Sequence, residues 1–380
     1  MNRPLRVVVC GTGFGQLYLE ALRAPRLPLE LAGVVARGSD RSRACAADHQ
    51  VPLYTAIGQL PADIDIGCVV VRGGLVGGNG SELARELAAR GVHVLQEHPV
   101  HHDELAETLR EARRHRVAYR LNSFYVHQAP VRRFLAAARE LLARQRIRYL
   151  DVACGFQAAY SALDIAGRLL GAVRPWELAA AVSGGGPFGT IDCTLAGVPT
   201  TFRIHHQLDP ADPDASAHLL HRITVGAEGG SLTLVTTHGP IVWNPRPGFP
   251  ARVRASAGTA NFYAGGAGSE EELDVSSGHL VGPAVAPSHR EIFGAVWPAG
   301  IEHALGELRR DIVSGASPMA DGQYHLMLCR LWQDIAARLG PPRLVREEPS
   351  GPLTAGDLLA MAEAGERAVS AEPVREGSSR

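Results

Sequence analysis

The chain has 380 residues, with 38 basic and 39 acidic side chains, so its formal net charge at neutral pH is −1. All the basic residues are arginine, and the absence of lysine excludes Schiff-base chemistry and any lysine acid or base. No basic block with interleaved aromatic residues is present, which argues against nucleic acid as a partner. A chain of this length is expected to form two domains with substantial cores.

The apolar runs are too short to cross a bilayer, and a strand begins within a few residues of the N-terminus, which leaves no room for a signal peptide. Six cysteines, at positions 10, 45, 68, 154, 193 and 329, lack the CxxC spacing of metal or redox motifs. They are typical of small apolar residues in a reducing compartment. We therefore expect a cytoplasmic protein without a membrane partner.

Strands and helices alternate over the first third of the chain. Strands are predicted at 5–10, 30–36, 66–71, 92–96 and 117–121, and amphipathic helices at 14–24, 40–48, 81–90 and 103–115. Such alternation predicts an α/β domain with a doubly wound parallel sheet of the Rossmann type. We assign residues 1–123 to this domain.

The pattern changes after this first third. A helix at 128–143, a strand at 147–156 and a helix at 161–170 precede strands at 178–183, 188–195, 200–208, 219–225, 231–236 and 241–243. Consecutive strands predict an α+β domain over 124–345, with an open, mostly antiparallel sheet and helices on one face. Residues 245–290 form a predicted irregular insertion, and helices are predicted at 298–314 and 322–339. The segment 346–380 is predicted to hold a helix near 354–369 and a disordered tail from Pro373.

The first strand runs into closely spaced glycines, in the order Gly11-Thr12-Gly13-Phe14-Gly15. Gly11 lets the chain turn tightly, and Gly13 lets backbone N–H groups approach a pyrophosphate at the start of the next helix. All five residues are therefore candidates for binding a dinucleotide cofactor. The common fingerprint has its third glycine where this chain has Gln16. Either Gln16 crowds the contact between helix and strand, or Gly15 gives the turn a different path.

The end of the second strand indicates which dinucleotide binds. An acidic residue there would accept a hydrogen bond from a free ribose 2′-hydroxyl, whereas this chain offers Arg37, Ser39 and Arg41. Guanidinium groups suit a 2′-phosphate. The sequence therefore predicts that residues 1–123 bind NADPH and NADP+.

A glycine-rich loop follows the strand at 66–71 and begins with Arg72. Ligands of open α/β sheets lie beyond the carboxyl ends of the strands, so we expect this loop, and Arg72 with it, to border the cofactor. A surface linker is the alternative interpretation.

Three segments are candidates for handling protons. The first, residues 96–102, follows the strand at 92–96 and contains His98. The second, residues 122–127, follows the strand at 117–121 and contains Tyr125, whose phenol can donate a proton to a developing anion or amide. The third, residues 160–164, contains a tyrosine and an aspartate at the start of a helix.

Other polar clusters favour structural roles. His98, His101 and His102 lack a second ligand cluster at metal-binding spacing, so we expect no metal. His205 and His206 are expected on a strand, facing opposite sides. Arginines at 132, 133, 139, 144, 146 and 148 form the densest basic patch, which is typical of a solvated helix face, with docking of an acidic partner as the alternative.

The whole layout resembles the glucose-fructose oxidoreductase/inositol dehydrogenase family, two-domain enzymes with a Rossmann domain and an open-faced sheet. Where that family places Glu-Lys-Pro, this chain has Glu97-His98-Pro99, so the resemblance implies that Glu97 and His98 border the cofactor. Where the family carries an Asp and a His, this chain has Gln157 and Ser161. The cofactor site is therefore kept, while the residues that oxidise sugar alcohols are absent.

The segments CGTGFGQLYLEAL, VVARGSDRS, LQEHPVHHDELA and YRLNSFYVHQAPVRRF resemble one branch of the family more closely. This branch is the thiazolinyl imine reductases of siderophore assembly lines. The resemblance implies NADPH-dependent reduction of a thiazoline to a thiazolidine, with the substrate tethered to a carrier domain of a nonribosomal peptide synthetase. It also implies that His98 and Tyr125 are the candidate proton donors, and that the protein is a homodimer.

Two alternatives stay open. One is a related NADP oxidoreductase that acts on a free small molecule, such as a sugar or a cyclic imine. The other is a regulatory protein that senses NADP without turnover. Activity on a carrier-bound thiazoline distinguishes both from the reductase.

Overall fold

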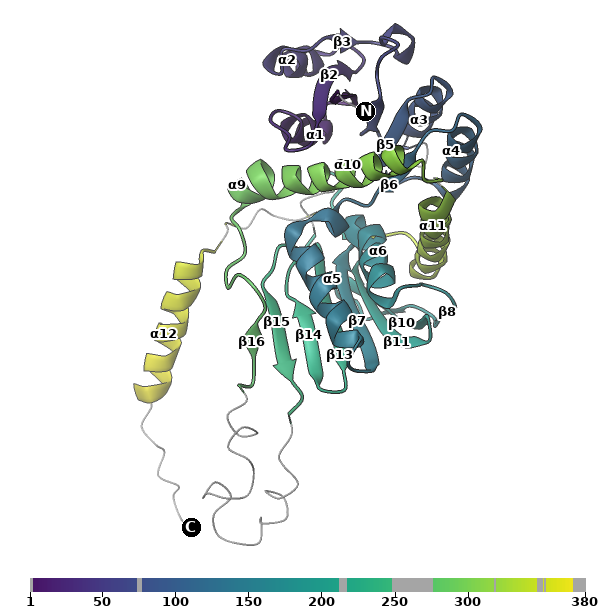
Figure 1. The fold of residues 1–380 in the computed structure, drawn as a ribbon. Helices are drawn as coiled ribbons and strands as arrows, with labels where there is room; N and C mark the ends of the chain where they lie inside the picture. Colours follow the sequence, from purple (N-terminus) through teal and green to yellow (C-terminus); the bar gives the residue numbers. More distant parts are fainter. Residues whose placement is uncertain are drawn as a thin grey trace, which may run out of the picture.

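The computed structural model describes residues 3–73, 77–211, 217–247, 276–317, 319–346, 351 and 353–371. Two sheets dominate it, one on each side of a long helix, α10 (Trp297–Ser314), as Figure 1 shows. The protein therefore has the α/β fold predicted, with a parallel N-terminal sheet and a mixed, mostly antiparallel C-terminal sheet. No helix of the described part of the chain is long and apolar enough to cross a membrane.

The N-terminal sheet is parallel throughout, with strand order β3-β2-β1-β4-β5-β6. The strands are β1 Leu5–Cys10, β2 Leu29–Val35, β3 Leu53–Tyr54, β4 Ile66–Val69, β5 His93–Glu97 and β6 Tyr119–Asn122, and the helices are α1 Gly15–Ala21, α2 Asp40–Asp48, α3 Gly80–Ala89 and α4 His102–Arg114. All five predicted strands are present. The sequence prediction missed β3, because its two residues are too few to show periodicity.

The C-terminal sheet has nine strands, of which only the neighbours β7 and β11 run parallel. Its strands are β7 Ile147–Gly155, β8 Trp176–Leu178, β9 Val182–Ser183, β10 Phe188–Leu195, β11 Val198–His205, β13 His221–Ala227, β14 Gly230–Leu234, β15 Ile241–Pro245 and β16 His279–Leu280. Helices α5 (Ala129–Leu142) and α6 (Ala159–Leu170) cover one face, as predicted.

Two predicted strands are shorter than expected. The strand predicted at 178–183 divides into β8 and β9, and the one predicted at 200–208 ends at His205, with β12 (Gln207–Leu208) pairing instead with β17 (Arg343–Leu344). His205 is buried on β11, whereas His206 lies in the chain between β11 and β12. Most of the insertion predicted at 245–290, and the tail from Pro373, lie outside the described residues.

The C-terminal helices return to the first domain. A helical segment begins at His289 and passes through a π-helical turn, Ile292–Val296, into α10. Ile301 and Leu305 of α10 are fully buried in one cluster with Tyr18 of α1. Helix α11 (Met319–Leu339) packs against α4 and α6. A helix that follows the second sheet in the chain therefore completes the core of the first domain.

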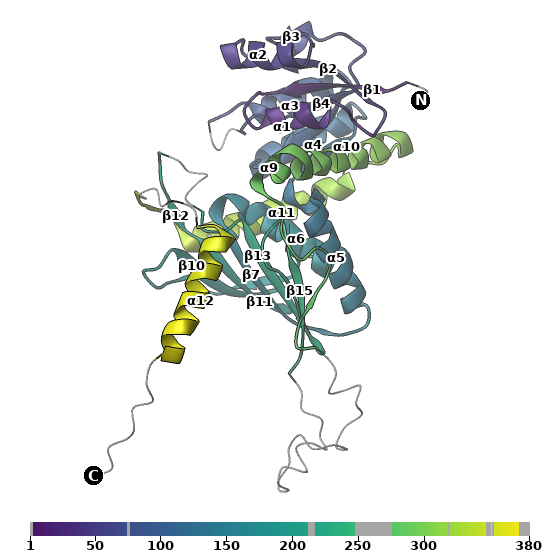
Figure 2. The same ribbon diagram turned by 90° about the vertical axis from the view of Figure 1, so that its left-hand side faces the viewer.

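Helix α12 (Ala355–Ala371) lies to one side of both sheets in Figure 1, and in Figure 2 it passes in front of the second sheet. Its residues 355–369 are all exposed, apolar ones included. It therefore contributes nothing to the arrangement of the site.

Candidate functional site

The loop after β1 has the geometry of a dinucleotide cradle. Gly11 has a φ of +98°, and a Cβ atom there would lie 2.6 Å from the carbonyl oxygen of Val70. Only glycine adopts this conformation in this space without strain. Gly13, in contrast, faces open space, because no atom lies within 4 Å of a Cβ built on it. This open side of the loop is where a pyrophosphate could approach the backbone.

The departure from the common fingerprint has a simple structural explanation. Helix α1 begins at Gly15, which is buried with its Cβ position 3.4 Å from Val9 and 3.7 Å from Val70. Gln16 is exposed, and its Nε2 donates to the carbonyl oxygen of Thr12 at 3.0 Å. The expectation that Gln16 crowds the contact between helix and strand was therefore wrong. Gly15, one position before the usual third glycine, lies at the contact between α1 and β1.

Thr12 and Phe14 complete this loop. Thr12 is buried, whereas the Phe14 side chain is 40% exposed, with its ring centroid 5.0 Å from that of Phe124. The loop thus offers open backbone at Gly13 beside the start of a helix, and these residues fit a dinucleotide.

The residues after β2 fit a phosphate. Ser39 caps α2, since its Oγ accepts a hydrogen bond from the N–H of Ser42 at 3.3 Å. Arg37 and Arg41 are exposed, and no ion pair to either is recorded among the described residues. Arg43, by comparison, is paired with Asp40 at 2.9 Å.

Arg72 is exposed at the start of the loop after β4, and its carbonyl oxygen accepts from the N–H of Gly80 at 3.0 Å. Residues 74–76 lie outside the described residues. A contact between this loop and the cofactor stays a prediction.

His98 directly follows β5 and is held by the ends of two neighbouring strands. Its Nδ1 lies 3.1 Å from Glu97 Oε1 and 3.1 Å from the carbonyl oxygen of Asn122. A carbonyl oxygen can only accept, so Nδ1 carries the proton and Nε2 remains for another partner. The ring is thus fixed in one tautomer.

Both carboxylate oxygens of Glu97 have hydrogen-bond partners within the protein. One of its oxygens faces His98, and the other accepts from the hydroxyl of Tyr18 and, at 3.1 Å, from the Nδ2 of Asn122. Burial and then the Glu97 carboxylate raise the pKa of Tyr18 well above its usual range, so this phenol stays protonated. Glu97 therefore orients His98 at the expected cofactor edge.

A strained turn positions Tyr125 after β6. Phe124 has a φ of 65° and a ψ of −65°, and the N–H of Tyr125 donates to the carbonyl oxygen of Ser123 at 2.8 Å. This is the rare γ-turn, which an L-residue adopts only when its surroundings enforce it. The side chain of Asn122 accepts from the N–H of Phe124 at 3.0 Å and stabilises the turn.

The structure brings His98, Tyr125 and the glycine loop to one edge. β1, β5 and β6 are parallel strands of one sheet, so the residues that follow them share its carboxyl edge. The ring of Trp297, at the start of α10, lies 6.1 Å from that of Phe14 and 6.3 Å from that of Tyr125. An aromatic residue of the C-terminal region therefore connects the loop and the candidate donor.

Sequence reasoning missed two residues here, Trp297 and His221. The ring centroid of His221 on β13 lies 4.9 Å from that of Tyr125, with the planes at 70°. His98 in turn stacks on Tyr160 of α6, with centroids 5.5 Å apart and planes at 20°. Each candidate donor thus contacts a ring of the second domain. A single histidine or tryptophan in an apolar stretch carries no local signal of this role.

The third predicted segment, 160–164, contributes an anchor rather than an acid. The buried Asp164 accepts from the hydroxyl of Ser123, from Arg168 at 2.7 Å and from Tyr324 at 2.9 Å. Burial alone would raise the pKa of Asp164, but Arg168 and these hydrogen bonds hold it at about 2. The carboxylate is therefore ionised and ties β6, α6 and α11 together.

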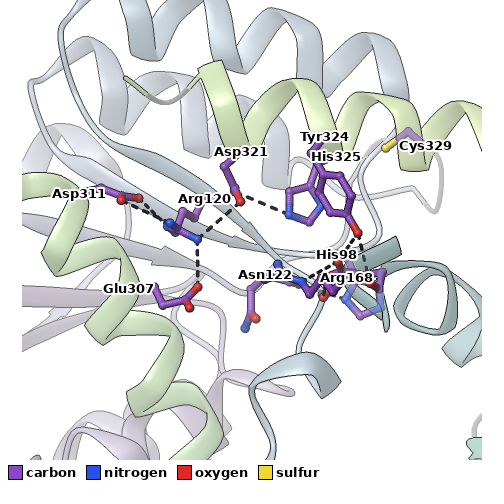
Figure 3. Close-up of polar contacts among 12 residues, drawn as sticks. His98, Arg120, Asn122, Arg168, Glu307, Asp311, Asp321, Tyr324, His325 and Cys329 are labelled. Atoms are coloured by element: carbon purple, nitrogen blue, oxygen red, sulfur yellow. Dashed lines mark hydrogen bonds and ion pairs between the residues drawn. The ribbon is translucent and has the colours of Figure 1, made fainter. Parts of the chain in front are cut away.

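One group of described residues has converging metal-ligand atoms, namely His127, His303 and Glu307, all within 4.8 Å of one another. Two guanidiniums already bind Glu307, Arg120 at 3.0 Å and Arg310 at 3.4 Å. Figure 3 shows Arg120 bound by acidic side chains from α10 and α11. This arrangement favours an ion-pair network over a metal site.

The other histidines and arginines singled out from the sequence take structural positions. His101 caps α4, where its Nδ1 accepts from the N–H of Asp103 at 3.3 Å, and His102 contacts the side chain of Asp103 at 2.9 Å. The arginines at 132, 133, 139, 144, 146 and 148 are all exposed, on α5, in the loop that follows it and at the start of β7.

Residues 5–123 match the model of the Gfo/Idh/MocA oxidoreductase family with its NAD-binding Rossmann fold. The N-terminal domain belongs to this oxidoreductase family. Residues 145–244 match the model of the C-terminal domain of Irp3-like thiazolinyl imine reductase. No curated protein matches the chain significantly.

Solved structures share the fold of this chain. KijD10, a 3-ketoreductase from Actinomadura kijaniata solved with NADP and TDP-benzene, has a TM-score of 0.62 at 15% identity over 90% of this chain and 100% of its own. A levoglucosan dehydrogenase with NADH and levoglucosan has 0.62 at 14% identity, over 89% and 98%. GenD2 of gentamicin A biosynthesis, with NAD, has 0.60 at 16% identity, over 89% and 95%.

Within this family fold, the helix position that the resemblance assigns to a catalytic histidine holds Ser161. Ser161 is fully buried, and its hydroxyl lies 2.8 Å from the Nε2 of His221. The imidazole of His221 on β13 therefore lies beside Ser161, although α6 has no histidine at this position. The protein is a Gfo/Idh/MocA oxidoreductase with an NAD(P)-binding domain.

Proposed function

We propose that the protein is an NADPH-dependent thiazolinyl imine reductase, which converts a carrier-bound thiazoline into a thiazolidine. The observation that carries this proposal is the match of residues 145–244 to the C-terminal domain of Irp3-like thiazolinyl imine reductase. The composition agrees with it, since the chain has no lysine and carries His98 between Glu97 and Pro99.

Reduction of a C=N bond needs a hydride at carbon and a proton at nitrogen. The glycine loop at Gly11, Gly13 and Gly15 would hold NADPH, which would supply the hydride. This chain must then deliver the proton to the ring nitrogen, where negative charge develops. General acid catalysis of this kind contributes about 10²–10⁴-fold to a rate.

Tyr125 and His98 have complementary roles in this scheme. The phenol of Tyr125 is a donor in its neutral form and is held after the strained turn at Phe124. Because Nδ1 of His98 faces Glu97 and Asn122, Nε2 is the ring nitrogen that can bind a water molecule, whose O–H can point to substrate. In this scheme Tyr125 donates the proton and His98 orients the water that can replace it.

Cofactor choice follows from the residues after β2. Arg37 and Arg41 are exposed and offer guanidiniums to a 2′-phosphate, and Ser39 lies between them in the chain. We propose that Arg37, Ser39 and Arg41 favour NADPH over NADH.

The partner in this proposal is a carrier domain of a nonribosomal peptide synthetase, whose phosphopantetheine thioester presents the thiazoline. The same family resemblance leads us to propose a homodimer. Sedimentation of the full chain tests the dimer, and steady-state rates with carrier-bound and free substrates test the carrier.

A second candidate function has one observation in its favour. The names of the similar solved structures include a levoglucosan dehydrogenase and a 3-ketoreductase. A sugar-acting reductase of the same family is therefore the alternative, although Gln157 and Ser161 stand where that chemistry has an Asp and a His.

The deciding experiment compares NADPH oxidation with two substrate sets. The first is a thiazoline attached as a thioester to a carrier domain or to N-acetylcysteamine, and the second is a panel of keto sugars. Turnover of the thioester with formation of the thiazolidine supports the proposal. Turnover of a sugar alone would establish the alternative, and NADPH binding without any turnover would indicate a sensor.

A further inference from the structure

His221, at the start of β13, is one of the fully buried histidines that the reaction scheme leaves unused. Its Nε2 lies 3.1 Å from the carbonyl oxygen of Ala158 and 2.8 Å from Ser161 Oγ. Its Nδ1 lies 2.9 Å from Thr237 Oγ1. The carbonyl oxygen of Ala158 can only accept, so Nε2 carries the proton and Nδ1 accepts from the threonine hydroxyl.

The hydrogen bonds fix the position of the His221 ring, and its burial fixes the charge. Burial lowers the pKa of His221 to about 3, so the ring is neutral at physiological pH. Its partners come from three places: Ala158 precedes α6, Ser161 lies in α6, and Thr237 lies in the turn after β14. A histidine bonded at both nitrogens cannot rotate without breaking a buried hydrogen bond.

The ring of Tyr125 packs against this fixed ring. The centroids are 4.9 Å apart and the planes stand at 70°, which is the favourable edge-to-face arrangement of two aromatic rings. Tyr125 contacts Phe124 at 5.0 Å on another side, and Phe124 lies in the strained turn. Tyr125 is therefore held by its own backbone on one side and by the second domain on the other.

We propose that His221 is a positioning residue that aligns the Tyr125 phenol with the ring nitrogen of the substrate. The inference rests on the proposed function, in which Tyr125 is the proton donor. His221 itself is buried and touches neither substrate nor cofactor in this scheme. It acts by limiting the orientations of the Tyr125 ring, because proton transfer needs hydrogen-bond distance and alignment.

The test separates the ring contact from the hydrogen bonds. His221→Asn keeps a polar side chain but removes the ring, whereas His221→Phe keeps a ring beside Tyr125. We expect His221→Asn to lower kcat about tenfold, with unchanged KM and unchanged NADPH affinity, and His221→Phe to restore most of that loss. In a Tyr125→Phe background, His221→Asn should cause no further loss, because the group it positions is gone.

His205→Asn is the matched control. His205 is a buried histidine of the same sheet, on β11, whose recorded ring contacts are with Phe188 and His218 rather than with Tyr125. It should leave kcat unchanged. The proposal would be overturned if His221→Phe lowered kcat as much as His221→Asn does. It would also be overturned if His221→Asn lowered kcat as much in the Tyr125→Phe background as in the wild type.

A second readout does not need turnover. The chain has eight tyrosines, so a protein labelled with 3-fluorotyrosine gives few ¹⁹F signals, and Tyr125→Phe identifies that of Tyr125. His221→Asn should shift or broaden this signal, while His205→Asn should not. An unmoved Tyr125 signal contradicts the positioning role. A moved signal in a protein that reduces no thiazoline supports the contact and places the failure in the proposed function.

Discussion

At the scale of single residues, the glycine loop separates a requirement of the fold from a requirement of the ligand. Gly11 is needed by the protein itself, because its φ is +98° and the Val70 carbonyl fills the space of a side chain. Gly13 is under no such constraint from the protein, and we propose that its lack of a side chain leaves room for a ligand.

This distinction predicts opposite effects of two alanine substitutions. Gly11→Ala should destabilise the cofactor-free protein by at least about 1–2 kcal/mol through backbone strain alone. Gly13→Ala should leave the cofactor-free stability within about 0.5 kcal/mol, yet weaken NADPH binding about tenfold or more. Thermal unfolding of the cofactor-free protein measures the stability, and titration with NADPH measures the affinity. Normal NADPH binding by Gly13→Ala would refute this assignment of the loop.

In the proposed function, Arg37 is the residue that selects NADPH over NADH. Arg37→Ala should weaken NADPH binding about 10–100-fold and leave NADH binding unchanged, because only the 2′-phosphate contact is lost. Arg43→Ala is the control, since Arg43 is paired with Asp40. An unchanged ratio of NADPH to NADH affinity in Arg37→Ala would disprove the 2′-phosphate assignment.

At the scale of elements, a buried cluster joins the end of β6 to α6 and α11. Asp164 is its centre, with Ser123, Arg168 and Tyr324 around it. It holds the backbone immediately before the γ-turn of Phe124. The turn that presents Tyr125 is therefore fixed by a charge pair from the second domain.

This cluster predicts a defined dependence of stability on pH. The pKa of Asp164 is about 2 in the folded protein, against an ordinary value of 3.8. A lowered folded-state pKa gives stability that is fully present above about pH 4 and is lost as the pH falls toward 2. Asp164→Asn should cost about 3–5 kcal/mol at pH 7, because it leaves Arg168 buried without its partner.

The difference in unfolding free energy between wild type and Asp164→Asn should stay constant from pH 5 to 7 and decrease below about pH 4. Urea unfolding at several pH values measures it. The exposed Asp48, also bound to an arginine, gives the control Asp48→Asn, with an effect of less than about 1 kcal/mol. A difference that grows on acidification would contradict this role of Asp164.

The sequence predicts those elements whose signals are local. Val7, Val8 and Val9 followed by Gly11 indicate a buried parallel strand and a tight turn, and both are present. The γ-turn at Phe124 was not predictable, because no glycine or asparagine marks its positive φ and distant contacts enforce it. His221 occupies an inward position of an alternating strand and is indistinguishable there from a core residue. Its contacts with Ser161 and Tyr125 depend on long-range packing.

At the scale of the whole molecule, helix α10 makes the two sheets one structure. It lies between them in Figure 1 and buries Ile301, Leu305 and Leu308 in the core that contains α1. Its first residue, Trp297, contacts both Phe14 and Tyr125. A helix from the C-terminal half thus supports the cofactor loop and the candidate donor together.

Leu305→Ala should therefore destabilise the cofactor-binding domain although residue 305 lies far from it in sequence. The expected cost is about 2–5 kcal/mol, because Leu305 is fully buried. Val313→Ala, at an exposed position of the same helix, should cost less than about 0.5 kcal/mol. Urea unfolding is monitored by circular dichroism and by loss of NADPH binding, and Leu305→Ala should lower the urea midpoint of both signals together. A loss of NADPH binding that does not shift would show that α10 is dispensable for the first domain.

The central claim is the reduction of a tethered thiazoline, and one measurement tests it most directly. The wild-type protein is incubated with NADPH and a thiazoline thioester on a carrier domain, and the carrier-bound product is weighed by intact-protein mass spectrometry. The predicted result is a gain of two hydrogens per thiazoline, matched by NADPH oxidation and strongly slowed in Tyr125→Phe with His98→Ala. A thiazoline that stays unreduced while NADPH binds normally would contradict the claim.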